Sequence, residues 1–315
     1  MKNSLFAIGI DLGGTAIKYG ICSGDGKIVS RFEKPSRADV SAGDILQDLT
    51  VAAQEALAQA ESSQLNIVAV GIGTPGSVDI HKGYLRSGTP NFKNWKNVAI
   101  RNALEKNLGL PVFVDNDANM MAYGEFRFGA GKGADNVVCI TLGTGIGGGI
   151  IIGKKLFRGT FWAGSEVGHM SIDYAGKKCR CGGTGCWELY ASASAMVRNY
   201  HSLHPWESPV GAREIFKRYE LKEEPAVRVV EEEIAMSAVG LANLVNIFNP
   251  HKIIIGGGLS EAGDWFIERI TNKVRERAME DAINSVEIVR AALGNKAGLL
   301  GAAALALEYI QNLND

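Results

Sequence analysis

The stretch LFAIGIDLGGTAIKYGICS runs from Leu5 to Ser23 and has the pattern of a β-hairpin. Residues 5–10 form an apolar run that predicts a buried strand, DLGGT predicts a tight turn, and residues 16–23 predict a second strand. The glycines lack the spacing of a P-loop, and a strand follows them where a dinucleotide-binding motif would continue as a helix. The chain is therefore expected to open with an antiparallel meander, whose third strand covers residues 27–33.

The same pattern recurs in the middle of the chain. Residues 137–142 are apolar, GTGIGGG at 143–149 predicts the turn, and residues 150–152 resume the strand. The recurrence indicates two related halves with a boundary near Asp117. Periodicity and apolar runs predict helices at 44–60, 100–108, 118–128, 227–246, 261–279 and 297–310, and strands at 67–72, 112–114, 253–255 and 286–290.

Composition narrows the class of protein. The chain has 315 residues, 46% of them hydrophobic and 21% charged, with a formal net charge of −1. That length allows two domains, and that charge gives no bulk attraction to nucleic acid or to an acidic membrane. No apolar stretch approaches the roughly 20 residues that span a bilayer. The first apolar run breaks at Asp11, unlike a signal peptide, so a cytoplasmic location with reduced thiols is expected.

The first glycine turn has the residues of a phosphate-binding hairpin. Gly13 and Gly14 leave backbone N–H groups free to face an anion, and Thr15 and Lys18 add a hydroxyl and a positive charge. Asp11 would repel a phosphate unless a cation lay between them, which makes it a candidate for orienting hydrated Mg²⁺. A tight hairpin without a ligand explains this single stretch equally well.

Two further glycine turns favour a bound nucleotide over that simpler explanation. Gly143, Thr144 and Gly145 repeat the first turn and could face it across a cleft. The glycines at 256, 257 and 258 (Gly256, Gly257, Gly258) follow a third apolar run and open a predicted helix, whose N-terminus favours anions. Three such turns in this order predict a nucleotide bound between two lobes.

Three of the five cysteines lie close together in CRCGGTGCWE, residues 179–188. In a cytoplasmic protein such a cluster favours metal binding over disulfide formation. The spacing C-x-C-x₄-C, with glycines between, lets the thiolates of Cys179, Cys181 and Cys186 converge on a tetrahedral zinc ion. Two alternatives remain. One is three reduced thiols in a loop; the other is a nucleic-acid zinc module, although the second CxxC or HxxxH pair of such modules is missing.

Seven motifs together resemble the ROK family of repressors and sugar kinases, within the actin-like ATPase and sugar-kinase superfamily. The resemblance covers nearly the whole chain and implies two ribonuclease-H-like α/β domains with a cleft between them. It places residues 1–117 plus 300–315 in a small N-terminal domain and residues 118–299 in a larger one. The motifs are DLGGTAIK (11–18), GIGTPG (71–76), DNDANMMAYGE (115–125), TLGTGIGGGI (141–150), EVGH (166–169), CRCGGTGCWE (179–188) and IIIGGG (253–258).

The resemblance also implies roles for the polar residues. Asp117 would be the base that takes the proton of the sugar 6-hydroxyl as this group attacks the γ-phosphate of ATP. A helix N-cap is the structural alternative for Asp117, and the two roles are compatible. Asp115 is expected to make structural hydrogen bonds. The implied sugar-binding residues are Asn91, Asn116, Glu166, His169 and Glu188.

A structural Zn²⁺ is implied by the same resemblance, with a histidine added to the three cysteines. Glu166 lies shortly before the histidine and Glu188 shortly after the last cysteine, so a bound zinc would fix both carboxylates. The implied ligands are His169, Cys179, Cys181 and Cys186.

Two residues depart from the family pattern. Ser165 stands where a small residue such as glycine is usual, and Trp187 where leucine is common. The tryptophan is expected to affect the wall of the sugar pocket, which leaves the sugar preference open.

The implied function is ATP-dependent phosphorylation of a hexose at the 6-hydroxyl, with glucose first because the motifs look most like those of the family's bacterial glucokinases. Kinases of fructose, mannose, allose, N-acetylglucosamine and N-acetylmannosamine have overlapping motifs and stay open. Sugar-responsive repressors of the family carry a DNA-binding segment ahead of the sugar domain. Here the hairpin begins by Ile8, so neither a repressor nor a nucleic-acid partner is expected. A chaperone-like or actin-like ATPase would not need the cysteine loop, and a homodimer is compatible with the family.

Overall fold

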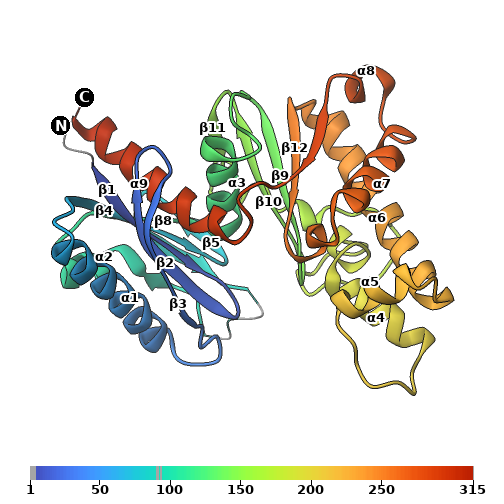
Figure 1. Cartoon of the computed structure of the whole chain (residues 1–315), viewed down its shortest axis with the longest axis horizontal. Helices are drawn as coiled ribbons and strands as arrows, with labels where there is room; N and C mark the ends of the chain where they lie inside the picture. The colour runs from blue at the N-terminus through green and yellow to red at the C-terminus, as the bar shows by residue number, and fades with distance from the viewer. Residues whose placement is uncertain (1–4, 90–91, 93, 315) are drawn as a thin grey trace.

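The computed structural model describes residues 5–89, 92 and 94–314, and it contains two five-stranded sheets side by side (Figure 1). The first sheet has the strand order β3-β2-β1-β4-β8, and the second has the order β11-β10-β9-β12-β13. In each sheet the first three strands form an antiparallel meander, and two later strands continue in parallel beyond the meander's first strand. This repeated order confirms the α/β fold expected from the sequence.

The strand bounds follow the apolar runs closely. The first sheet contains β1 (Phe6–Leu12), β2 (Ala16–Ser23), β3 (Ile28–Pro35), β4 (Ile67–Thr74) and β8 (Val112–Asn116). The second contains β9 (Val137–Leu142), β10 (Ile146–Ile152), β11 (Lys155–Phe157), β12 (Lys252–Gly256) and β13 (Glu287–Arg290). A small third sheet, which the sequence did not indicate, contains β5 (Ser77–Asp79), β6 (Tyr84–Ser87) and β7 (Val98–Ala99).

Different helices cover the two faces of the first sheet, because successive side chains of a strand point to opposite faces. Ile8 and Ile10 belong to the core that α1 (Ala42–Ser62) and α2 (Ile100–Leu108) cover. Ala7 packs on the other face against α9 (Ala297–Asn314). The last helix therefore returns to the sheet formed by the start of the chain, along β1 and β4 (Figure 1).

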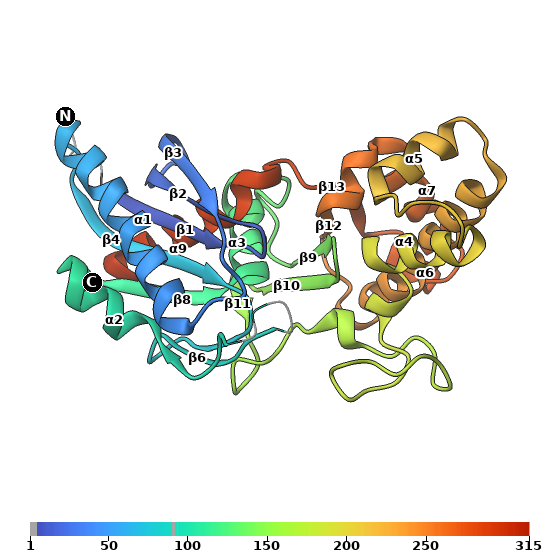
Figure 2. The same cartoon turned by 90° about the horizontal axis from the view of Figure 1, so that it is seen from below.

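The helix α3 (Asp117–Phe128) links the two sheets. It packs against β9 and β10 and crosses α9, and seen from below it lies between the sheets (Figure 2). The crossing is close because it occurs at glycines. A Cβ added at Gly124 would overlap the carbonyl oxygen of Ala297, and one at Gly301 would overlap that of Met120. The geometry requires both residues to lack a side chain.

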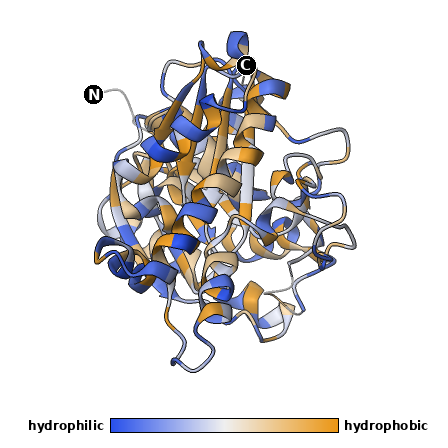
Figure 3. Ribbon diagram, turned by 90° about the vertical axis from the view of Figure 1, so that its right-hand side faces the viewer, coloured by the Kyte–Doolittle hydropathy of each residue, from blue (hydrophilic) through white to orange (hydrophobic). Residues whose placement is uncertain are grey.

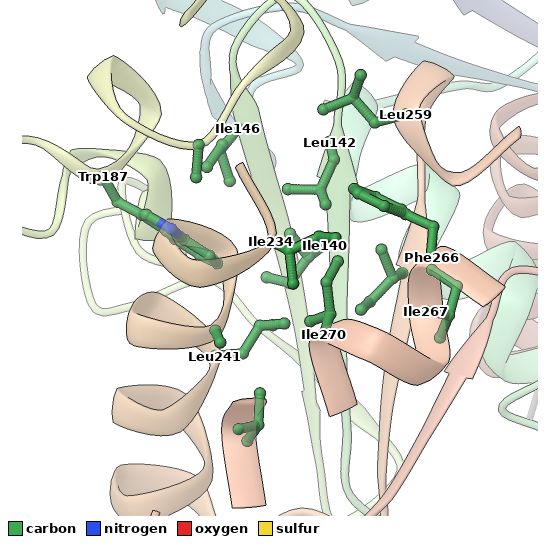
Figure 4. Close-up of a cluster of buried hydrophobic side chains, with 14 of the residues drawn as sticks. Ile140, Leu142, Ile146, Trp187, Ile234, Leu241, Leu259, Phe266, Ile267 and Ile270 are labelled. Carbon is green, nitrogen blue, oxygen red and sulfur yellow. The ribbon is translucent and has the colours of Figure 1, made fainter. Parts of the chain in front are cut away.

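The second sheet has its main core on the face away from α3. Ile140 and Leu142 of β9 pack among apolar side chains of α6 (Glu224–Phe248) and α7 (Asp264–Arg275) (Figure 4). The helices at this end of the molecule each combine hydrophobic and hydrophilic residues, as expected for helices that bury one side (Figure 3). The others are α4 (Ala193–Leu203), α5 (Ala212–Glu220) and α8 (Glu280–Ile283). Across the described ranges, no helix has the length and hydropathy needed to cross a membrane.

Two boundaries differ from the expectation. The turn expected over 143–149 is confined to 143–145, because Gly147–Gly149 continue β10 and pair with β9. A Cβ at Gly149 would overlap the side chain of Ala122 in α3, so this glycine makes room for a helix. The helix expected over 261–279 is divided at Gly263, whose φ is 112°. A 3₁₀ turn covers Gly258–Ala262 before it, and α7 follows it.

Candidate active site

A cleft of about 1780 Å³ lies between the two sheets. Most of the residues that the sequence singled out line this one cleft, although they come from distant parts of the chain. Thr15 and Cys186 do not line it, and Asn91 lies outside the described residues. The predicted residues that do line it are Asp11, Gly13, Gly14, Lys18, Asn116, Asp117, Gly143, Thr144, Gly145, Glu166, His169, Cys179, Cys181, Glu188, Gly256, Gly257 and Gly258.

Asp117 is the first residue of α3 and stands half-buried directly after β8. Asn116, not Asp117, caps the helix, with its Oδ1 accepting from the N–H groups of Ala118 at 2.9 Å and Asn119 at 3.2 Å. Burial, and then the negative charge of Asp11, raise the pKa of Asp117 to about 7. Asp117 is therefore not the cap, although its Oδ1 also accepts from the N–H of Ala118 at 3.0 Å, and its raised pKa suits exchange of a proton near neutral pH.

The side-chain amide of Asn116 makes two kinds of hydrogen bond, one through its oxygen and one through its nitrogen. Its Oδ1 is occupied by the helix cap, and its Nδ2 donates to the carbonyl oxygen of Gly76 at 3.2 Å. The amide nitrogen carries a second hydrogen, which is available to a hydroxyl in the cleft. Asn116 can therefore contact a ligand, but only as a donor.

Each of the two hairpin turns is closed by a backbone hydrogen bond from its first glycine, although the first turn is one residue longer. The N–H of Gly13 donates to the oxygen of Ala16, and the N–H of Gly143 to that of Gly145, both at 3.0 Å. These two N–H groups are thus used within the turns, contrary to the expectation for Gly13. The N–H groups of Gly14 and Thr144 donate to no atom of the described residues, and they remain available to an anion.

The first hairpin carries charge as well as backbone donors. Asp11 and Lys18 are directly opposite each other in the β1–β2 register. Burial raises the pKa of Asp11, and the positive charge of Lys18 opposes that rise. A Cβ at Gly298 in α9 would lie 2.7 Å from the Asp11 carboxyl carbon, so a glycine there admits this side chain.

Glu166, His169 and Glu188 come together beside the cysteine loop. The Nδ1 of His169 lies 3.6 Å from Glu188 Oε1 and 3.7 Å from the sulfur of Cys179. Burial raises the pKa of Glu166, which His169 opposes and Glu188 reinforces. The arrangement presents carboxylate acceptors to the cleft, suited to a ligand rich in hydroxyl groups.

The four expected metal ligands form one cluster. One ligand atom from each of His169, Cys179, Cys181 and Cys186 lies within 4.8 Å of the others. The sulfur atoms of Cys181 and Cys186 are 3.5 Å apart, and all five cysteines of the chain are free thiols. Four such donors in this geometry can hold a tetrahedral cation.

Trp187 does not reach the pocket wall, contrary to the sequence-based expectation. Its side chain is fully buried against Gly240 of α6, and its Nε1 donates to the carbonyl oxygen of Met236 at 2.9 Å (Figure 4). It anchors the residue next to Glu188 to the core. Ser165 has a φ of 68°, in the left-handed region that favours glycine.

Sequence reasoning missed several residues that line the cleft. Arg213, Lys217 and Trp265 come from α5 and α7 and line it beyond the second hairpin, and Ser77 and Thr89 line the side of the small sheet. Basic residues on an amphipathic helix are ordinary surface residues in a sequence, so no signal distinguished them. Arg158, which does not line the cleft but bridges the two sheets through Asp115 at 2.6 Å, was also missed, because its partner is 43 residues away in the sequence.

Comparisons with known proteins show which family the chain belongs to. A family model described as the ROK family matches residues 7–309. A glucokinase of Thermotoga maritima is 36% identical over 96% of this chain and 98% of its own. The structure of a ROK family glucokinase from Streptomyces griseus, in complex with glucose and AMPPNP, is 37% identical with a TM-score of 0.83, covering 96% of this chain and 99% of that one. A xylose repressor of Bacillus subtilis is 30% identical over 99% of this chain and 79% of its own. The chain therefore belongs to the ROK family.

Proposed function

We propose that this protein is a hexose kinase that transfers the γ-phosphate of ATP to the 6-hydroxyl of a sugar, with glucose as the preferred substrate. The observation that carries the proposal is the position of Asp117. A carboxylate with a pKa of about 7 lines the same cleft as two phosphate-type hairpins and the pair Glu166 and Glu188. The similarity to glucokinases supports the same reaction.

Asp117 accepts the proton of the attacking sugar hydroxyl in this mechanism. The unprotonated carboxylate is needed for this step, and phosphoryl transfer otherwise requires positioning more than covalent chemistry. Glu166, Glu188 and the Nε2 of His169 bind the other hydroxyls and hold the sugar in place. Asn116 adds its remaining amide hydrogen.

The hairpins hold the nucleotide opposite the sugar. The free N–H groups of Gly14 and Thr144 bind phosphate oxygens. Gly256–Gly258 lack side chains, so the adenine ring of ATP can lie close to the backbone there. Asp11 fits a role as the partner of hydrated Mg²⁺, because its carboxyl lines the cleft beside Lys18. A bound Mg²⁺ would neutralise part of the negative charge of the phosphates.

A structural Zn²⁺ fits the His–Cys₃ cluster. Zn–S bonds of about 2.3 Å place the sulfur atoms of a tetrahedral site about 3.8 Å apart. The observed separation of 3.5 Å between the sulfur atoms of Cys181 and Cys186 is close to this. The 3.7 Å between the Cys179 sulfur and His169 Nδ1 is close to the roughly 3.6 Å that a Zn–S and a Zn–N bond would give. The ion would fix Glu188, whose oxygen already lies 3.7 Å from the Cys179 sulfur. Reduced cysteines at this site suit a cytoplasmic location.

The chain has two domains in this proposal, residues 1–117 with 300–315 and residues 118–299. The boundary falls where β8 passes into α3, at the base itself. Closure of the domains about this point would exclude water, which would otherwise replace the sugar as the acceptor of the phosphate.

Transfer of labelled phosphate from ATP to a panel of sugars tests the function. Glucose, mannose, fructose, allose, N-acetylglucosamine and N-acetylmannosamine are compared at equal concentration with the purified protein and Mg²⁺. We expect glucose to have the highest kcat/KM. Sugar binding without any phosphorylated product would favour the role of the similar xylose repressor instead.

The zinc ion is tested by metal analysis and chelation. We expect one zinc per chain, and we expect chelation to weaken sugar binding before it changes ATP binding, because Glu188 depends on the ion and the hairpins do not. Protein purified without chelators and still free of zinc would rule out the ligand set. Cys22→Ser, a buried thiol of β2 away from the cluster, is the control for Cys186→Ser.

A further inference from the structure

A buried ion pair connects the two sheets directly behind the proposed base. The Nε of Arg158 lies 2.6 Å from Oδ2 of Asp115, and the two side chains are 14% and 3% exposed. Arg158 follows β11 of the second sheet, and Asp115 lies in β8 of the first. The pair therefore adds a side-chain contact between the two sheets to the connections that the chain makes through α3 and α9.

Asp115 uses its other oxygen to hold the start of α3. Its Oδ1 accepts from the backbone N–H of Asn116 at 2.7 Å and from Nδ2 of Asn119 at 2.9 Å. These two residues lie on either side of Asp117 in the sequence. Any displacement of the Asp115 carboxylate therefore displaces the helix turn from which the base projects.

Arg158 holds the segment that leads to Glu166 through its backbone. Its carbonyl oxygen accepts from the N–H of Gly164 at 2.9 Å, and the preceding carbonyl, of Phe157, accepts from the hydroxyl of Ser165 at 3.0 Å. The loop from 158 to 165 is thus closed at its base, and Glu166 follows at once. Arg158 thus contacts Asp115, near the proposed base, with its side chain. Its backbone supports the loop that leads to Glu166.

The tip of the same loop also rests on the first half of the chain. The hydroxyl of Ser77 donates to the carbonyl oxygen of Trp162 at 3.3 Å, and Arg86 Nη1 donates to that of Phe161 at 3.4 Å. The guanidinium of Arg86 also lies 4.8 Å from the centre of the Trp162 ring. The loop is therefore fixed at both its base and its tip, at the end of the cleft where Glu166 lies.

Stability alone does not account for the pair. A buried ion pair contributes little net stability, because the cost of desolvating both charges offsets their attraction. The Nη2 of Arg158 is buried and has no hydrogen-bond partner among the described residues, which adds to that cost. What the pair does supply is a fixed geometry between two segments.

We propose that Arg158 is a positioning residue for phosphoryl transfer, which sets the distance between Asp117 and Glu166 so that a sugar held by one is within reach of the other. The inference rests on the proposed function. It predicts that the sugar end of the cleft is assembled before substrate binds, while the phosphate-binding end depends on the hairpins.

Kinetics of Arg158→Met, Arg158→Lys and Asp115→Asn test the proposal in the full-length protein. Misplacement of reacting groups by about 1 Å can cost about 100-fold in rate. We expect Arg158→Met to lower kcat by about 10-fold to 100-fold and to raise the KM for glucose, with the KM for ATP changed less than about twofold. Arg158→Lys should recover part of the loss because it keeps the charge.

The double variant Arg158→Met/Asp115→Asn should be no slower than the worse single variant, because both changes break one contact. Arg37→Met, which breaks the exposed pair with Asp48, is the matched control and should leave both KM values unchanged. If Arg158→Met fails to fold, Arg158→Lys and Asp115→Asn test the proposal instead. Each should lower kcat and raise the KM for glucose while the KM for ATP changes little.

A purely structural role for Arg158 predicts a lower melting temperature with unchanged kcat and KM values for the folded fraction, and that result would overturn the inference. Equal increases in both KM values would do the same. Failure of the proposed function is distinct, because the unmodified protein would then phosphorylate no sugar at all.

Discussion

The two sheets share one strand order but end their equivalent strands in different chemistry. In the first sheet, β1 ends in the hairpin that carries Asp11, and β8 is followed by Asp117. In the second, β9 leads into Gly143–Gly145, and β13, which has the place of β8, is followed by Ala291. Gly256–Gly258 follow β12, which has the place of β4, and none of these residues is a carboxylate. The fold thus supplies two equivalent rims. Among these strand ends, the carboxylates Asp11 and Asp117 occur on the first rim only, whereas backbone N–H groups available to an anion occur on both, at Gly14 and Thr144.

The largest effect is expected at the acidic rim, from Asp117→Asn. The amide has nearly the same shape but cannot accept the hydroxyl proton, so kcat should fall by about 100-fold to 10,000-fold while sugar binding persists. Steady-state kinetics and calorimetric titration with glucose measure the two properties. Asp39→Asn, an exposed residue away from the cleft, is the control. Near-normal turnover would remove Asp117 as the base.

The pH dependence should report the same carboxylate. Because the pKa of Asp117 is raised to about 7, the protonated, inactive form accumulates as pH falls through that value. We expect kcat to fall about tenfold for each pH unit below the pKa. Cation binding at Asp11 should move the midpoint lower, since it neutralises the charge that helps to raise it. A rate independent of pH between 5 and 8 would contradict the assignment.

The crossing of α3 and α9 between the sheets is expected to matter for the stability of the protein more than for its catalytic rate. Gly301→Ala places a Cβ against the Met120 carbonyl, where α9 crosses α3, and should destabilise the protein by about 1–3 kcal/mol. Denaturant unfolding measures the change. Gly43→Ala in α1, where a Cβ meets only an ordinary contact 3.6 Å from Ser41 Oγ, should be close to neutral. Similar stabilities for the two variants would show that the crossing tolerates a side chain.

The smallest effect distinguishes the two hairpins. Thr144 lines the cleft and Thr15 does not, although the motifs are alike. Loss of one hydroxyl hydrogen bond costs about 0.5–1.5 kcal/mol, so Thr144→Val should raise the KM for ATP about 2-fold to 10-fold. Thr15→Val should leave it unchanged. Equal effects of both substitutions would show that the rims contact the phosphates symmetrically.

Features set by neighbouring residues could be predicted from the sequence. The strands around both hairpins, the amphipathic helices and the convergence of Cys179, Cys181 and Cys186 depend on spacing within short segments, and the structure reproduces them. The recurrence of the hairpin also indicated the repeated sheet.

Contacts between distant segments could not be predicted. Nothing local shows that Arg158 meets Asp115, or that Trp187 turns into the core and away from the pocket. The glycines of β10 resembled a longer turn because sequence patterns do not show the helix that packs on them. Burial and partners at such positions depend on the whole fold.

The return of α9 to the first sheet has a consequence for synthesis. Ala7, Cys22 and Ala69 form an apolar face that is covered mainly by side chains of the last helix, such as Leu299 and Ala303. While a ribosome is still translating the middle of the chain, this face stays open, so the N-terminal segment cannot complete its fold as it emerges. We expect the nascent protein to need protection by a holding chaperone until release.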